Sequence, residues 1–168
     1  MQLKKLDGDL FSHLEHSKAT KIVLPHVCND LGVWASGFVV PLAKRFPASR
    51  EKYVQAFAAA QDGDQPKLGW MQIVPCSMLS DSNPRSVWVC NMIAQHGVSV
   101  SDGRPPIRYV ALVDCMKKVA ALATAHEAEI HAPMFGSERA GGNWEFIEGL
   151  IQETWLDLGI PVTIYCLK

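Results

Sequence analysis

The sequence predicts a single α/β domain in which helices cover both faces of a mixed β-sheet, a three-layer α/β/α sandwich. Stretches typical of buried strands alternate with stretches of helical periodicity, and two strand-like stretches in the middle suggest a hairpin. A length of 168 residues suits one domain with a full core, so we expect residues 1–168 to form one unit.

The N-terminal half predicts an edge strand, a buried strand and two helices. Residues 1–6 are short and amphipathic, and Lys21–Val27 is typical of a buried strand. Apolar residues recur at helical spacing across 34–46, a stretch that ends in a basic turn followed by proline. Residues 50–60 are rich in alanine and predict a second helix, whereas the polar stretch 11–20 predicts a solvated loop or helical turn.

The C-terminal half predicts a β-hairpin, two helices and two further strands. Residues 68–75 and 87–94 are rich in Val, Ile and Trp, and the turn sequence S-D-S-N-P lies between them. Helical periodicity extends over 107–127 and returns over 144–156, where one face carries large apolar side chains. The two further strands are expected at 128–135 and 162–167.

Composition and charge are those of an ordinary globular protein. Hydrophobic residues make up 48% of the chain, charged residues 20%, and the net charge is −1. Because no stripe of Lys and Arg is present, we expect no binding to unmodified nucleic acid. The chain has no apolar run of about 18 residues and no signal-peptide pattern, so we expect no membrane partner and a cytoplasmic location. The five cysteines form no C-x-x-C pair, and we expect reduced thiols, no metal and no cofactor.

Two loops that contain glycine follow strand-like runs. Pro133–Trp144 reads P-M-F-G-S-E-R-A-G-G-N-W and leads into a helix, and the loop after Lys21–Val27 carries Asn29, Gly32 and Gly37. A glycine loop between a strand and a helix N-terminus suits an anion, because backbone N–H groups and the helix dipole both face it. The simpler interpretation of each loop is a tight turn. If both strands end at one sheet edge, the loops would form the two walls of one crevice.

The ordered set of these motifs resembles the macro domain family, which binds ADP-ribose. The closer likeness is to the subgroup that contains ADP-ribose 1″-phosphate phosphatases and terminal ADP-ribose–glutamate hydrolases. It rests on H-x-C-N-x-x-G-x-W-x-x-G-F at 26–38 and the glycine loop at 136–144, with G-D-L-F at 8–11, N-M-I-A-Q-H-G at 91–97 and V-T-I-Y-C-L at 162–167. The resemblance implies the three-layer α/β/α sandwich of macro domains and a partner that is ADP-ribose or an ADP-ribosylated molecule.

The resemblance also implies a set of ligand contacts. It places Asp9 and Leu10 against the adenine, Asn29 against the distal ribose and Leu167 against the adenine. From the residues alone, Asp9 is a turn or cap residue, Asn29 caps the turn after it, and Leu167 packs. The implied ligand-binding residues are Asp9, Leu10, Asn29, Gly32, Trp34, Ala35, Ser36, Gly37, Phe38, Pro133, Phe135, Gly136, Ser137, Glu138, Arg139, Ala140, Gly141, Gly142, Trp144 and Leu167.

Three functions stay open at this stage. The first is an enzyme that hydrolyses ADP-ribose 1″-phosphate or an ADP-ribosyl ester. The second is a non-catalytic ADP-ribose reader. The third is a related fold that binds another nucleotide or a protein partner. The catalytic candidates are His26, at the expected end of its strand, and Asn29. The glutamate hydrolases of the family use a lysine and an aspartate where this chain has Gln95 and Ala140, which argues against their lysine-adduct route.

Glu138 stands where the family usually has glycine. A carboxylate beside a diphosphate is an electrostatic misfit, because like charges about 4 Å apart repel by roughly 4 kcal/mol at an effective dielectric near 20. We expect Glu138 to point to solvent beside Arg139. The alternative is that it faces the terminal ribose and acts as a general acid.

Overall fold

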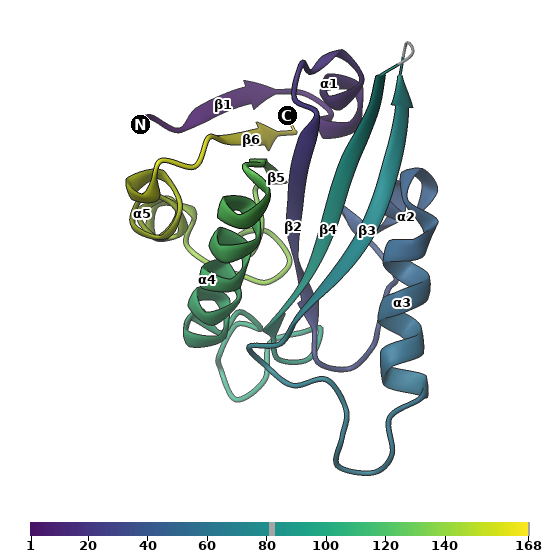
Figure 1. The fold of residues 1–168 in the computed structure, drawn as a ribbon. Helices are drawn as coiled ribbons and strands as arrows, with labels where there is room; N and C mark the ends of the chain where they lie inside the picture. The colour runs from purple at the N-terminus through teal and green to yellow at the C-terminus, as the bar shows by residue number, and fades with distance from the viewer. Residues whose placement is uncertain (81–82, 168) are drawn as a thin grey trace.

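The computed structural model describes residues 1–80 and 83–167 and contains a mixed six-stranded sheet (Figure 1). The strand order is β1-β6-β5-β2-β4-β3, and the β3–β4 pair is antiparallel whereas the other four pairs are parallel. The strands are β1 (Lys4–Asp7), β2 (Lys21–Asn29), β3 (Met71–Ser80), β4 (Asn83–Gln95), β5 (Glu129–Pro133) and β6 (Val162–Cys166).

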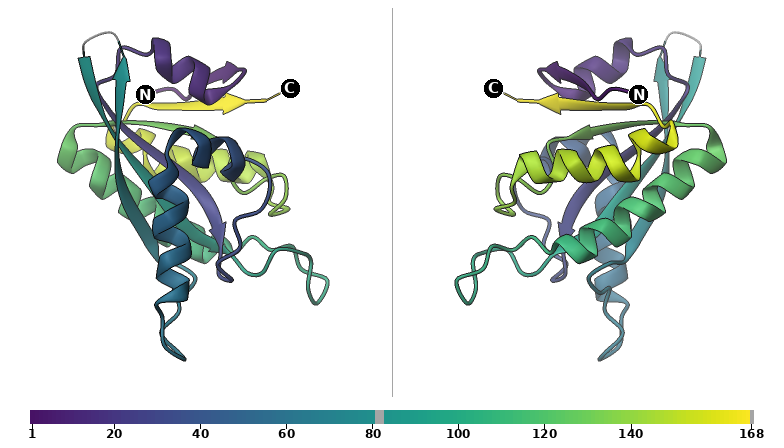
Figure 2. Two further views of the ribbon diagram at one scale, coloured as in Figure 1. Left: turned by 90° about the vertical axis from the view of Figure 1, so that its right-hand side faces the viewer. Right: turned by 90° about the vertical axis from the view of Figure 1, so that its left-hand side faces the viewer.

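Helices cover both faces of the sheet, as Figure 2 shows from two sides. One layer consists of α1 (Leu10–His16), α2 (Val39–Arg45) and α3 (Pro47–Ala58). The other consists of α4 (Tyr109–His126) and α5 (Trp144–Thr154), with the short 3-10 helix η1 (Leu156–Leu158) after it. The predicted three-layer α/β/α sandwich with a mixed sheet is therefore confirmed.

Strand β2 lies in the middle of the sheet and divides the core in two. Ile22 and Leu24 pack in the apolar cluster beneath α1 and α2, whereas Val23 packs in the cluster beneath α4 and α5. Because side chains alternate between the faces of a strand, His26 lies on the same face as Ile22 and Leu24. This alternation points His26 toward the layer that contains α2 and α3.

The loop after β2 differs from the prediction. We expected a helix across 34–46, but α2 begins only at Val39. The carboxamide of Asn29 accepts hydrogen bonds from the backbone N–H groups of Leu31 and Val33, which holds this stretch in a turn. Side chains that bond nearby backbone groups compete with helix formation in this way. Residues 30–38 therefore remain an open loop at the sheet edge.

Two further helix boundaries differ from the prediction for reasons of capping. The stretch expected as a solvated loop or helical turn contains α1, whose first turn is capped by the Asp9 carboxylate through the Ser12 N–H. Pro47, expected to end a helix, also begins α3, because proline at the first helical position needs no N–H partner.

The predicted hairpin is present and longer than expected. Its register extends from Met71↔Met92 to Ser80↔Asn83, and residues 81 and 82 of the predicted S-D-S-N-P turn lie outside the described residues.

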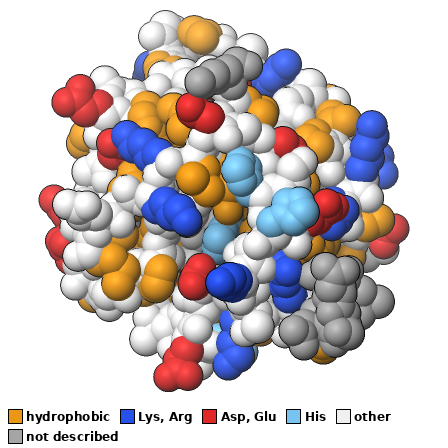
Figure 3. Space-filling model, turned by 90° about the horizontal axis from the view of Figure 1, so that it is seen from above, with side chains coloured by type: hydrophobic (Ala, Val, Ile, Leu, Met, Phe, Trp, Pro, Cys, Tyr) orange, Lys and Arg blue, Asp and Glu red, His pale blue; other side chains and the backbone are white. Residues whose placement is uncertain are grey.

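Across the described ranges, no helix combines the length and apolarity needed to cross a membrane. Seen from above, Lys and Arg side chains are interspersed with Asp and Glu (Figure 3).

Candidate functional site

A cavity of about 530 Å³ opens at the sheet edge where β2, β4 and β5 end. Ligand sites in open α/β sheets form at this edge, where the loops that leave neighbouring strands move apart. The walls of the cavity are the loop after β2 and the loop after β5, so the structure brings both glycine loops to one cavity. The lining residues are His26, Val27, Cys28, Asn29, Val33, Trp34, Ala35, Ser36, Gly37, Phe38, Val39, Gln95, Val98, Pro133, Met134, Phe135, Gly136, Glu138, Arg139 and Ala140.

Most of the predicted site residues are in this lining, and several are outside it. Those outside are Asp9, Leu10, Gly32, Ser137, Gly141, Gly142, Trp144 and Leu167. The cavity is also lined by residues that the sequence motifs did not identify as contacts. These are Val27, Cys28, Val33, Val39, Gln95, Val98 and Met134. Most of these are neighbours in sequence of predicted residues, so their proximity along the chain was the available signal.

The residues predicted to contact adenine have other neighbours in this structure. One Asp9 carboxylate oxygen accepts both the N–H and the hydroxyl of Ser12 at 2.9 Å, so Asp9 is the N-cap of α1. Leu10 is buried in the core under α1, and Leu167 is 71% exposed beyond the end of β6. Their proposed role against adenine therefore requires a ligand that extends beyond the cavity.

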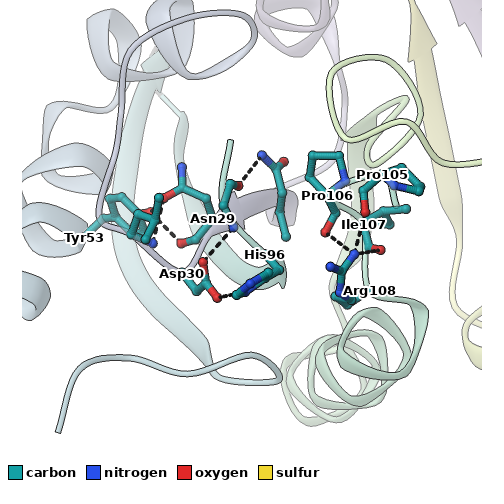
Figure 4. Close-up of polar contacts among 11 residues, drawn as sticks. Asn29, Asp30, Tyr53, His96, Pro105, Pro106, Ile107 and Arg108 are labelled. Carbon is teal, nitrogen blue, oxygen red and sulfur yellow. Dashed lines mark hydrogen bonds and ion pairs between the residues drawn. The ribbon is translucent and has the colours of Figure 1, made fainter. Parts of the chain in front are cut away.

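Asn29 shapes the wall of the cavity (Figure 4). Its Oδ1 accepts from Leu31 N at 3.0 Å, Val33 N at 3.1 Å and the Tyr53 hydroxyl at 3.0 Å, and its Nδ2 donates to Val33 O at 2.7 Å. An amide nitrogen has two hydrogens, so one N–H of Asn29 is left to meet a ligand. The side chain thus caps the turn, as the interpretation from the residues alone had it, and lines the cavity.

A second set of contacts holds the neighbouring rim in place (Figure 4). Asp30 accepts from Gly97 N at 2.8 Å with one oxygen and pairs with His96 Nδ1 at 2.7 Å with the other. Arg108 donates to backbone carbonyls of the segment that precedes it, including Pro106 O at 3.3 Å. These contacts fasten the segment that carries Val98, a lining residue. The sequence analysis did not identify the Asp30 contacts, because they join residues far apart in the chain.

His26 lies inside β2 rather than at its end, because the strand continues to Asn29. It is 2% exposed, its ring meets Trp34 edge-on with centroids 5.5 Å apart, and its Nε2 is 2.5 Å from Asn91 Oδ1. Burial lowers the pKa of His26 to about 4, and the hydrogen bond to Asn91 opposes that shift only in part. His26 is therefore a neutral imidazole at neutral pH.

Arg139 joins the two loops across the cavity. Its Nη1 donates to Ser36 Oγ at 2.8 Å, and its side chain covers Gly37, where a Cβ would lie 3.3 Å from Arg139 Nε. Glu138 is exposed at the rim. Among the described residues Glu138 and Arg139 form no ion pair, because the guanidinium reaches the opposite loop instead.

The wall opposite Arg139 offers backbone donors. Residues 34–37 donate no backbone hydrogen bond to the part of the chain that the structure describes. A guanidinium beside several open N–H groups is a favourable site for phosphate oxygens. Within residues 1–80 and 83–167, no group of three His, Cys, Asp or Glu side chains is arranged to hold a metal ion.

Comparisons with known proteins agree with this architecture. No family profile matches the sequence. The chain is 27% identical over 161 residues to the ADP-ribose 1″-phosphate phosphatase of Candida albicans, an alignment that covers 90% of this chain and 92% of that protein. A Bacteroides thetaiotaomicron protein of unknown function superposes with a TM-score of 0.83 at 36% identity, covering 99% of this chain and 98% of that one.

A macrodomain protein from Streptomyces coelicolor is 34% identical to this chain, with a TM-score of 0.72 and 98% of both chains covered. Identity at this level over nearly the full length goes beyond a shared fold. It also agrees with the motif order at residues 26–38 and 136–144 and with the cavity between the two loops. This chain belongs to the macrodomain family.

Proposed function

We propose that this chain binds ADP-ribose and hydrolyses ADP-ribose 1″-phosphate to ADP-ribose and inorganic phosphate. The observation that carries the proposal is one cavity that combines Arg139 and residues 34–37, which we propose as the anion site, with a buried neutral histidine, His26. The likeness over 90% of the chain to a protein named ADP-ribose 1″-phosphate phosphatase supports the same substrate.

The cavity fits a nucleotide-sized ligand in volume and in chemistry. Ligand sites typically enclose about 300–1,000 Å³ and combine apolar walls with a few polar groups, and this cavity of about 530 Å³ is within that range. Trp34, Phe38 and Phe135 supply apolar surface for sugar or base, and Arg139 supplies the positive charge for phosphate. Asn29 adds one amide N–H suited to a ribose hydroxyl.

The hydrolysis that we propose uses water as the nucleophile. Burial raises the pKa of the Cys28 thiol well above its usual range, so this lining residue stays protonated and is a poor nucleophile. His26, neutral, accepts a proton as the water oxygen bonds to phosphorus, and the bond between phosphorus and the ribose oxygen breaks. The ribose oxygen leaves and takes up a proton from solvent water, His26 returns its proton to solvent, and the donors near Arg139 hold the phosphate oxygens.

Two measurements on the unmodified protein test this function. We expect calorimetry to give a micromolar Kd for ADP-ribose, on the order of −8 kcal/mol, and we expect release of inorganic phosphate from ADP-ribose 1″-phosphate. Binding without phosphate release would favour a non-catalytic reader. Neither heat nor thermal shift at millimolar ADP-ribose would refute both functions.

The reader function is favoured by two lining positions. Gln95 and Ala140 both face the cavity, and neither side chain supplies a nucleophile, a base or an acid. Gln95 Nε2 donates instead to Gly97 O at 2.9 Å, which is a structural contact. The lysine-adduct hydrolysis of ADP-ribosyl esters therefore receives no support from these positions, and the phosphatase and the reader remain the two candidates.

Replacing Arg139 tests the anion site. Arg139→Ala should weaken ADP-ribose binding by about 10- to 100-fold, because a hydrogen bond to a charged group contributes roughly 1.5–3 kcal/mol. Titrations at increasing salt should show a shallower salt dependence for the variant than for the unmodified protein. Arg104→Ala is the matched control, since Arg104 is exposed and outside the lining. Equal losses for both variants would mean that only general surface charge matters.

We further propose a cytoplasmic location and a partner list without unmodified nucleic acid or a membrane. The free cysteines, of which Cys28, Cys90 and Cys115 are buried, support a reducing compartment. The net charge of −1, together with the interspersed charges on the face in Figure 3, supports the exclusion of a phosphate backbone as the main partner.

A further inference from the structure

A row of three polar side chains crosses the sheet beneath α3. Asn91 of β4 lies in register with His26 of β2 on one side and with Gln72 of β3 on the other. Side chains at paired positions of neighbouring strands lie on the same face, so the three form a continuous row. Asn91 and His26 are buried, and apolar strand residues precede both of them on this face.

Two backbone carbonyls of α3 set the orientation of this row. Gln72 Nε2 donates to Lys52 O at 3.0 Å, so Gln72 Oε1 is directed at Asn91. Asn91 Nδ2 donates to Ser49 O and to Gln72 Oε1, both at 3.0 Å. A carbonyl oxygen only accepts hydrogen bonds, so the amide nitrogen of Asn91 must face Ser49. The oxygen of Asn91 is therefore the atom that faces His26.

The orientation of Asn91 determines which nitrogen of His26 carries the proton. Asn91 Oδ1 only accepts, and it is 2.5 Å from His26 Nε2, so Nε2 must be the N–H of the neutral ring. Nδ1 is then the unprotonated nitrogen. The one polar contact of Nδ1 among the described residues is Cys28 Sγ at 3.8 Å, and Sγ is equally far from Nε2, off the axis of the Nδ1 lone pair.

We propose that Asn91 is a positioning residue that holds His26 as the Nε2–H tautomer, so that His26 offers the Nδ1 lone pair to the cavity. This inference rests on the proposed hydrolysis and specifies the role of His26 in it. With a lone pair at Nδ1, His26 accepts a hydrogen bond or a proton from a bound water and has no proton to donate there. A histidine held in this way is ready to act as a base before substrate arrives.

The groups around His26 leave this tautomer undisturbed in the absence of ligand. Trp34 and Phe38 from the loop after β2 pack against the ring, and Ser49 of α3 contributes a backbone carbonyl to Asn91. The other titratable residues that line the cavity are Cys28, Glu138 and Arg139. Burial keeps the Cys28 thiol protonated, and Glu138 and Arg139 are exposed at the rim.

Nitrogen NMR on the unmodified protein tests the tautomer without any assay of turnover. In a two-bond ¹⁵N–¹H correlation spectrum, we expect His26 to show a protonated Nε2 and an unprotonated Nδ1 at pH 7. Loss of signals in His26→Gln assigns the resonances, and buried His131, bonded to Tyr165 and Glu129, is an internal reference. A protonated Nδ1, or a charged ring at pH 7, would overturn the proposal.

Two substitutions in the polar row complete the test. Asn91→Leu removes the acceptor for Nε2, so we expect a mixed or inverted tautomer, a kcat lower by about tenfold or more, and a nearly unchanged Kd for ADP-ribose. Gln72→Leu should affect kcat much less, since Ser49 O still orients Asn91. Equal kcat for Asn91→Leu and the unmodified protein would refute the role of Asn91. Absence of phosphate release from the unmodified protein would instead refute the proposed function.

Discussion

Gly142→Ala is expected to distort the second loop and to weaken ADP-ribose binding by about 100-fold. Gly142 N donates to Gly136 O at 2.8 Å, which closes the loop on itself. A Cβ on Gly142 would lie closer than 3.0 Å to Gly136 O and 3.3 Å from Ile147 Cδ1. Because a backbone carbonyl cannot move aside without moving the loop, the wall of the cavity should shift, and the expected loss of about 100-fold in affinity corresponds to about 3 kcal/mol of binding free energy.

A second glycine in the same region provides the control for this prediction. Gly149 lies within α5, and a Cβ there would meet no atom within 4 Å. Gly149→Ala should raise the free energy of unfolding by about 1 kcal/mol, because alanine is the better helix former, and should leave binding unchanged. Urea denaturation and calorimetry on both variants give the comparison. If Gly142→Ala bound ADP-ribose as tightly as Gly149→Ala, binding would not depend on the closure of the second loop at Gly142.

His26→Gln is expected to lower kcat for phosphate release at least about 100-fold, the usual contribution of a general base. The glutamine amide is able to replace Nε2 as the donor to Asn91, so the polar row keeps its contact while the base is removed. The Kd for ADP-ribose should stay within about threefold. A variant that keeps both kcat and Kd would show that His26 is only a packed core residue.

The pH dependence of turnover gives a second test of His26. Since its pKa is lowered to about 4, His26 is neutral and able to accept a proton above that pH. The loss of turnover that is due to protonation of His26 should therefore appear only as the pH drops through about 4. The substrate phosphate has its own ionisation near pH 6, and an inflection there should appear in every active variant. An acid limb at the ordinary histidine pKa would mean that the ring is solvated during turnover.

Local patterns were sufficient to predict the sheet and the position of the cavity. The buried-type strand at 21–27 and the apolar stretch at 128–135 were identifiable because parallel central strands are apolar on both faces. The two glycine loops follow those strands, and strand direction alone places them at one edge. Chain connectivity and alternation thus determine where the site lies, although not how its side chains bond.

Hydrogen bonds between side chains of distant segments could not be predicted from the sequence. Arg139 was predicted beside Glu138, its neighbour in the chain, but it bonds to Ser36, 103 residues away. Asn91 was noted only as part of a motif, since its contacts with His26 and Gln72 depend on the register of three strands. Asp9 was assigned to adenine by resemblance, and that assignment stays a prediction; the structure adds a local contact, in which one Asp9 carboxylate oxygen accepts the Ser12 N–H.

Helix α3 does more for the cavity than cover the sheet, although none of its residues lines it. The carbonyls of Ser49 and Lys52 orient the polar row, and the hydroxyl of Tyr53 bonds to both the carbonyl and the side chain of Asn29. A shift of α3 by one residue would rotate it by about 100° and break all of these contacts at once. Exposed positions such as Arg50 and Glu51 make none of these contacts, so substitutions there should leave the cavity unchanged, whereas any change in how α3 sits on the sheet should disturb its wall.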